Sequence, residues 1–145
     1  MANTELESQI INHLEFLGYE VNPVPGIDAP EGMGMLRAEH SSGGSINIMF
    51  FGKTVEFSIW MGLNDSAMTS RQSLLETVNA LNNKFETTYR VGNMEGTPAF
   101  FCSLSYRGPY EKKAFGQFVS AWERNMQALW GTEIIKFLAS GSSCP

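Results

Sequence analysis

Cysteine and histidine are scarce in this 145-residue sequence, which contains two of each. Cys102 and Cys144 form neither a CxxC pair nor a metal-ligand spacing, and His13 and His40 stand near no cysteine or carboxylate in such a pattern. The sequence therefore predicts no metal site and no cofactor, with both thiols reduced. We expect Cys102 to be a small core residue and both histidines to be exposed to solvent.

Motifs of catalysis and nucleotide binding are also missing. Phe51-Gly52-Lys53-Thr54 looks like the end of a phosphate-binding loop, but Asn47 stands where that motif needs its first glycine. Gly32-Met33-Gly34 begins a dinucleotide fingerprint, yet Arg37 replaces the third glycine. No GxSxG elbow is present. The sequence therefore names no catalytic residue and predicts a protein that is not an enzyme.

Basic residues are too few and too dispersed for a nucleic-acid surface. The chain has 10 Lys and Arg against 15 Asp and Glu, for a net charge of -5, and only Lys112 and Lys113 are adjacent. No segment approaches the roughly 18 apolar residues of a membrane span, and residues 1–5 do not begin a leader peptide. We expect a cytoplasmic protein with neither nucleic acid nor membrane as a partner.

What the chain does have is a hydrophobic period that changes repeatedly. Apolar residues recur at helical spacing, then alternate as in strands, and the two periods exchange four times along the sequence. Helical spacing covers Leu6–Leu17, Leu74–Phe85 and Phe115–Trp130, and alternation covers Ile46–Met61 and Tyr89–Tyr106. The second alternating stretch is predicted to be a hairpin with strands Glu86–Val91 and Ala99–Tyr106, joined by a loop through Gly92–Gly96.

This order predicts one α+β domain over residues 1–131, with the elements helix, three strands, helix, two strands, helix. The strands should form an antiparallel sheet with the helices packed mainly on one face. Asn22–Gly34 holds three prolines and three glycines and is predicted to be a connector before a strand near Met35–Glu39. Residues 132–145 are predicted to be a C-terminal tail, partly apolar and then rich in Ser and Gly. Its apolar residues, Ile134, Ile135, Phe137 and Leu138, are expected to form one more turn that docks on the domain.

The hairpin after this connector has a register that can be tested. If Gly52-Lys53 is a two-residue loop, antiparallel pairing places Phe51 opposite Thr54 and Ile48 opposite Phe57. A slip by one residue would turn every side chain to the other face, so the register is strongly specified. The expected core face carries six apolar residues: Ile46, Ile48, Phe50, Val55, Phe57 and Ile59.

Large apolar residues also occur on the opposite face of the predicted sheet, where an open sheet is normally polar. They are Met49, Phe51, Trp60 and Phe101, and together they form the candidate protein-binding surface. A contiguous exposed apolar patch is typical of a partner surface. The alternative is that this face is covered by the connector Val21–Met33 or by the C-terminal tail, and the sequence leaves both open.

The second predicted helix carries a family resemblance. Leu75–Phe85 has Val-Asn-x-x-Asn-x-x-Phe character, formed by Val78, Asn79, Asn82 and Phe85, and is followed by a hairpin and the amphipathic helix Ala114–Trp130. This pattern resembles the bacterial YbjN-like family, often labelled sensory-transduction regulators, whose fold resembles that of type III secretion chaperones. The resemblance implies small, acidic, non-enzymatic homodimers that bind protein segments.

We therefore expect a bacterial, YbjN-like protein-binding or regulatory module that acts through an apolar surface as a homodimer. Its partner would be a protein segment or a second copy of the chain. A secretion-type chaperone for a protein effector is the first alternative. A small-ligand sensor or a small hydrolase is the second, because space between sheet and helices could hold a ligand.

Overall fold

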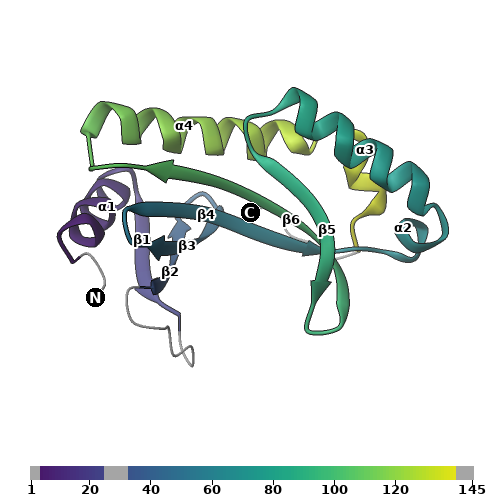
Figure 1. Cartoon of the computed structure of the whole chain (residues 1–145), viewed down its shortest axis with the longest axis horizontal. Helices are drawn as coiled ribbons and strands as arrows, with labels where there is room; N and C mark the ends of the chain where they lie inside the picture. Colours follow the sequence, from purple (N-terminus) through teal and green to yellow (C-terminus); the bar gives the residue numbers. More distant parts are fainter. Residues whose placement is uncertain (1–3, 25–32, 140–145) are drawn as a thin grey trace. The chain divides into compact units, whose positions relative to one another are not determined.

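The computed structural model describes residues 4–24 and 33–139 (Figure 1). These residues belong to two compact units, the first made of residues up to 58 with 105–119, and the second of residues 59–104 with those from 120 onward. In chain order the elements are α1 (Thr4–Phe16), β1 (Tyr19–Pro23), β2 (Met33–His40), β3 (Ser45–Phe51), β4 (Thr54–Gly62), α2 (Asp65–Thr69), α3 (Arg71–Lys84), β5 (Thr88–Met94), β6 (Thr97–Arg107), α4 (Lys112–Leu129) and the 3₁₀ helix η1 (Glu133–Phe137).

The predicted α+β class with an antiparallel sheet is confirmed. The sheet has six strands in the order β1-β2-β3-β4-β6-β5, so β1 and β5 are its edge strands. The predicted helices and strands are present, and β1, α2 and η1 are additional to them. The boundary predicted between a domain at 1–131 and a tail at 132–145 stays a prediction.

Strand β1 corrects the predicted connector. Asn22 and Pro23 belong to β1, which pairs antiparallel with β2 from Tyr19 opposite His40 to Pro23 opposite Leu36. Proline is tolerated at the edge of a sheet because its missing N–H is not needed there. Because β1 is short and contains Pro23, the hydrophobic period of the sequence did not predict this strand. Residues 25–32 of the predicted connector lie outside the described residues.

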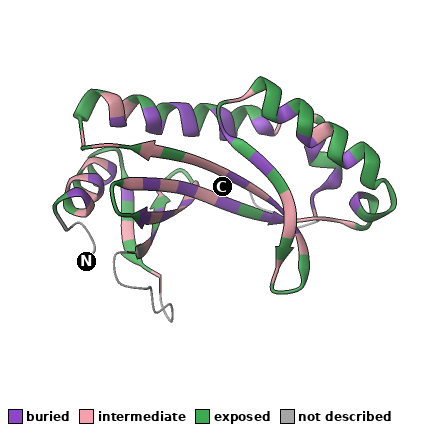
Figure 2. Ribbon diagram, viewed as in Figure 1, coloured by how far each residue is buried: buried purple, intermediate pink, exposed green. Residues whose placement is uncertain are grey.

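The core of the first unit follows the predicted hydrophobic pattern. Helix α1 buries Leu6, Ile10 and Leu14 along one face (Figure 2). The β3–β4 register is the predicted one, with Phe51 opposite Thr54 and Ile48 opposite Phe57. The Phe57 ring centroid lies 4.6 Å from that of Phe118 and 6.1 Å from that of Phe115, both on α4. Burial of these rings contributes to the hydrophobic stabilisation of the unit.

In the second unit, α3 buries Leu74, Val78 and Leu81, and Cys102 on β6 is buried as predicted. The predicted loop Gly92–Gly96 is wrong, because only Glu95 and Gly96 separate β5 from β6 and Met94 pairs with Thr97. Both turn residues have positive φ, 51° and 83°. A tight hairpin turn of this kind matches the twist of the flanking strands.

The segment after α4 packs within the second unit. Ile134 and Phe137 of η1 are buried. The side-chain amide of Asn64 donates hydrogen bonds to the carbonyl groups of Lys136 and Leu138, at 2.8 and 3.1 Å. The expectation that this segment adds one more docked turn is therefore confirmed.

Candidate protein-binding surface

The four predicted surface residues fall into two pairs, one in each unit. Met49 and Phe51 lie on β3 in the first unit, whereas Trp60 on β4 and Phe101 on β6 lie in the second. Trp60 is 45% exposed and Phe51 37% exposed, and the other two are half-buried. Within each unit these residues alternate with buried ones, so they lie on the sheet face that points away from that unit's core.

In the second unit, Trp60 and Phe101 face each other on neighbouring strands. The backbone N–H of Leu63, which directly follows β4, donates to the carbonyl of Pro98 on β6 at 3.1 Å. Facing residues in an antiparallel pair have a constant sum of residue numbers, so this bond places Trp60 opposite Phe101. Both chain neighbours of Trp60 are buried, as this alternation requires.

Arg90 extends this arrangement to the third strand. It pairs with Phe101 across the β5–β6 hairpin, and its Cζ atom lies 4.1 Å from the centroid of the Phe101 ring. Gly92 leaves room beside this stack, since a Cβ there would lie 3.0 Å from Nη1 of Arg90 and 3.2 Å from the Phe101 ring, closer than an ordinary contact. We call Arg90, Phe101 and Trp60 the outer row. A cation on an aromatic ring is favourable by about 0.5–1 kcal/mol at an exposed site.

Sequence reasoning missed Arg90 because it placed a five-residue loop between β5 and β6. The signal that could have found it is Glu95-Gly96, since glycine at the second position of a two-residue turn accepts a positive φ. With that turn in place, Arg90 falls opposite Phe101.

In the first unit, the apolar part of the outward face lies around Met49 and Phe51. Met49 lies between Met35 on β2 and Glu56 on β4, and Phe51 lies opposite Thr54. Of these five residues only Phe51, at the end of its strand, is exposed, and the other four are half-buried. Met35, Met49 and Phe51 therefore form the apolar part of the outward face in this unit.

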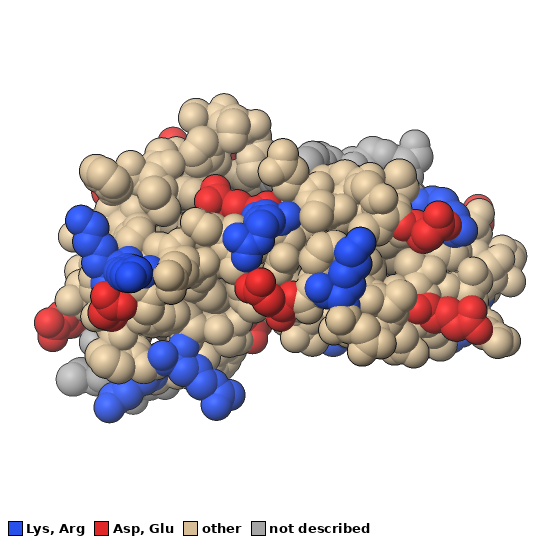
Figure 3. Space-filling view, turned by 90° about the horizontal axis from the view of Figure 1, so that it is seen from above, with Lys and Arg blue, Asp and Glu red and all other residues tan. Residues whose placement is uncertain are grey.

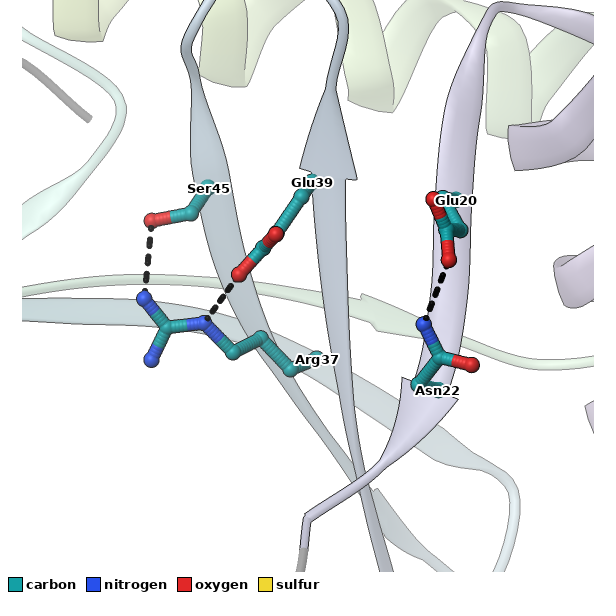
Figure 4. A network of polar contacts seen from close by, with 5 residues as sticks. All are labelled: Glu20, Asn22, Arg37, Glu39 and Ser45. Atoms are coloured by element: carbon teal, nitrogen blue, oxygen red, sulfur yellow. Dashed lines mark hydrogen bonds and ion pairs between the residues drawn. The ribbon is translucent and has the colours of Figure 1, made fainter.

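The rest of that face is polar (Figure 4). Arg37 donates from Nε to the carboxylate of Glu39 at 3.0 Å and makes a longer contact, 3.5 Å, with the hydroxyl of Ser45. On β1 the amide of Asn22 donates to the carboxylate of Glu20 at 3.2 Å. These side chains are exposed, and such pairs contribute little to stability. They give this part of the face an ordinary solvated surface.

Both histidines are half-buried and hydrogen bonded, so they are less exposed to solvent than predicted. Nδ1 of His13 is hydrogen bonded to the hydroxyl of Tyr110 at 2.7 Å, and the ring lies edge-on to Phe115. Burial, and then the positive charge of Lys112, lower the pKa of His13. His13 thus joins α1 to the segment before α4.

His40 also holds parts of the first unit together. Its Nε2 donates to the carbonyl of Leu17 at 3.0 Å, and its Nδ1 lies 2.6 Å from the hydroxyl of Ser42 and accepts from the Ser42 N–H at 3.1 Å. The ring therefore links the end of α1 to the β2–β3 turn. This role explains its place without any catalytic function.

Among the described residues, a shallow groove is found in each unit. In the first, a space of about 410 Å³ is bordered by Glu5, Leu6 and Gln9 of α1, by Lys53 and by residues 108–110. In the second, a space of about 370 Å³ is bordered by α3 and η1. Across residues 4–24 and 33–139, no three His, Cys, Asp or Glu side chains gather closely enough to hold a metal ion. In the same residues no helix has the length and apolar character that crossing a membrane requires.

No family model and no curated protein matches this chain. Among solved structures, YbjN, "a putative transcription regulator from E. coli", matches with a TM-score of 0.70 and 15% identity over 92% of this chain and 96% of that one. This chain has a YbjN-like fold. An uncharacterized protein from Methanothermobacter thermautotrophicus matches with a TM-score of 0.60 and 12% identity, over 86% of this chain and 94% of that one. The predicted resemblance to YbjN is confirmed at the level of the fold.

Proposed function

We propose that this protein is a non-enzymatic regulatory module that binds a protein segment through an apolar surface, with Trp60 as the anchor. The observation that carries the proposal is the exposure of Trp60, 45%, at a position opposite Phe101. A tryptophan on an outward sheet face exposes a large apolar area to water, and aromatic residues are enriched among the energetically dominant residues of interfaces.

The arrangement around Trp60 supports this role. Arg90 covers the ring of Phe101, so the row combines an aromatic anchor with an arginine, and both aromatic residues and arginine are enriched in interface centres. Strands β4, β6 and β5 hold the three side chains, and rigid elements position binding residues better than loops do. Met49 and Phe51 would contribute a second contact area in the first unit.

A protein partner fits the charge of the chain better than a nucleic acid. The net charge is -5, and in Figure 3 basic and acidic side chains are interspersed over the face shown, without a continuous basic area. Binding to a phosphate backbone depends on such an area. If this protein is a regulator, in line with the description of YbjN as "a putative transcription regulator", contact with a protein is the mechanism that we propose.

The first partner that we propose is a second molecule of this chain. The two copies would form a cytoplasmic homodimer of the kind that the family resemblance implies. A two-fold interface needs the same patch on both copies, and the surface around Trp60 supplies one. Light scattering at tens of micromolar concentration should report about twice the chain mass of 16.1 kDa. A monomer at that concentration would rule out the homodimer and leave a separate protein as the proposed partner.

A small-ligand sensor is the second candidate, and the groove in the first unit favours it. This groove of about 410 Å³ has an apolar side chain, Leu6, and a cation, Lys53, on its border. Its volume is in the range of small-molecule sites. Lys53→Ala would weaken binding of an anionic ligand there and would leave any association through Trp60 unchanged.

A further inference from the structure

The β5 strand has an unpaired backbone edge. It is the outermost strand on one side of the sheet, and β6 is its only strand neighbour in the described residues. Because the β5–β6 turn has two residues, Met94 and Thr97 form a hydrogen-bonded pair, and every second residue of β5 before Met94 also bonds to β6. The residues between them direct their N–H and C=O groups away from β6: Tyr89, Val91 and Asn93.

One of these three residues is already satisfied by a side chain. The amide of Asn82 on α3 donates to the carbonyl of Tyr89 at 2.8 Å and accepts from the Tyr89 N–H at 2.7 Å. It takes the place that a neighbouring strand would have. No described residue does the same for Val91 or Asn93, so each keeps one free donor and one free acceptor. Such an edge is a template for another extended chain.

The side chains beside this edge indicate what the added chain would carry. Arg90 points to the outward face, and no carboxylate of the described residues pairs with it. Val91 points to the opposite face and is half-buried. Side chains of an added strand alternate between the two faces, so an acidic one would lie near Arg90 and an apolar one near Val91.

We propose that the edge of β5 from Val91 to Asn93 binds an extended segment of another protein by strand addition. The segment alternates acidic side chains, which pair with Arg90, and apolar ones, which pack beside Val91. Backbone hydrogen bonds supply affinity in this mode and the alternate side chains supply specificity. The site goes beyond the proposed function, because it depends on the backbone edge and not on Trp60.

The test uses a dye-labelled, end-blocked peptide in which valine and glutamate alternate, with binding followed by fluorescence anisotropy. Asn93→Pro removes one outward N–H but no hydrogen bond to β6, because the N–H of Asn93 points away from β6. Proline is tolerated at an edge position of this kind. Loss of one such bond should weaken binding about fivefold. The matched control, Asn93→Ala, keeps the backbone donor and should bind as the wild type does.

Two further measurements keep the test independent of how well Asn93→Pro folds. On the wild-type protein, the same peptide with alternate N-methylated amides should lose most of its binding, because it cannot bond along the edge. Arg90→Glu should weaken the glutamate peptide about fivefold and should favour a peptide in which lysine replaces glutamate. A thermal melt of each variant confirms that it is folded.

Other outcomes would overturn the proposal. Equal binding by the N-methylated peptide, or unchanged preference in Arg90→Glu, would show that the edge is not used. If the wild type binds no peptide but forms a dimer that Asn93→Pro dissociates, the edge would be assigned to a second copy of this chain. Weakening by Trp60→Ala but not by Asn93→Pro would refute the edge site while leaving the function proposed for Trp60 in place.

Discussion

Asn82 is hydrogen bonded twice to the backbone of Tyr89, so one side chain joins the last turn of α3 to the start of β5. Both bonds are partly buried, and each contributes about 0.5–1.5 kcal/mol to stability. Asn82→Ala should therefore lower the free energy of unfolding by about 1–3 kcal/mol in urea denaturation. Asn83→Ala, an exposed neighbour, is the control and should change it little. Equal small losses in both variants would contradict this role.

The register of the β3–β4 hairpin predicts very different effects for two nearby residues. Phe57 is fully buried and packs on Phe115 and Phe118, whereas Thr54 is half-buried beside the turn. Phe57→Ala should lower the free energy of unfolding by about 3–5 kcal/mol, and Thr54→Ala by far less. Chemical denaturation of the two variants measures the difference, and similar losses would refute the packing.

Cys102 should be unreactive in the folded protein. It is buried, and burial raises the pKa of its thiol, so little of the nucleophilic thiolate is present. In a Cys144→Ser variant, which leaves one thiol, iodoacetamide should modify Cys102 only after denaturant is added. Rapid modification under native conditions would rule out a core position. Cys144 itself lies outside the described residues.

His13 should make stability depend on pH. Its folded pKa is below the ordinary value of 6.5, first because of burial and then because of Lys112. The unfolded chain therefore binds the proton more readily, and the free energy of unfolding should fall as the pH drops below about 6.5, toward the folded pKa. Urea denaturation at a series of pH values measures this slope.

The matched variants for this prediction are His13→Gln and Asn12→Ala. His13→Gln should flatten the pH dependence, because it removes the titrating group. Asn12→Ala changes an exposed neighbour of His13 and should retain the pH dependence of the wild type. A slope that persists unchanged in His13→Gln would assign the pH dependence to another group.

Much of the first unit could be predicted from sequence, because local signals agree there. Gly52 at the tip of the β3–β4 turn has a φ of 60°, and the alternation on both strands fixes their register. The β5–β6 hairpin was harder. Three residues, Gly92, Asn93 and Gly96, are all turn formers, and only tertiary pairing decides that the first two belong to a strand.

For the candidate surface, the sequence predicts only which face of the sheet each residue lies on. Alternation assigns Trp60 and Phe101 to the outward side, but it does not pair residues of different hairpins. Their opposition depends on the contact between β4 and β6, which are far apart in sequence. The stacking of Arg90 on Phe101 likewise passes close to Gly92, and the hydrophobic period of the sequence does not report such a close approach.

The most direct test of the central claim is Trp60→Ala, followed by both a thermal melt and sedimentation equilibrium. Leu75→Ala is the matched control, because Leu75 is comparably exposed, 42%, on α3 of the same unit. Trp60→Ala should leave the melting temperature nearly unchanged and weaken self-association by about 2 kcal/mol, the size of an interface hot spot. Leu75→Ala should change neither. A lower melting temperature for Trp60→Ala, with association as in the wild type, would mean that Trp60 stabilises the fold and is not a binding residue.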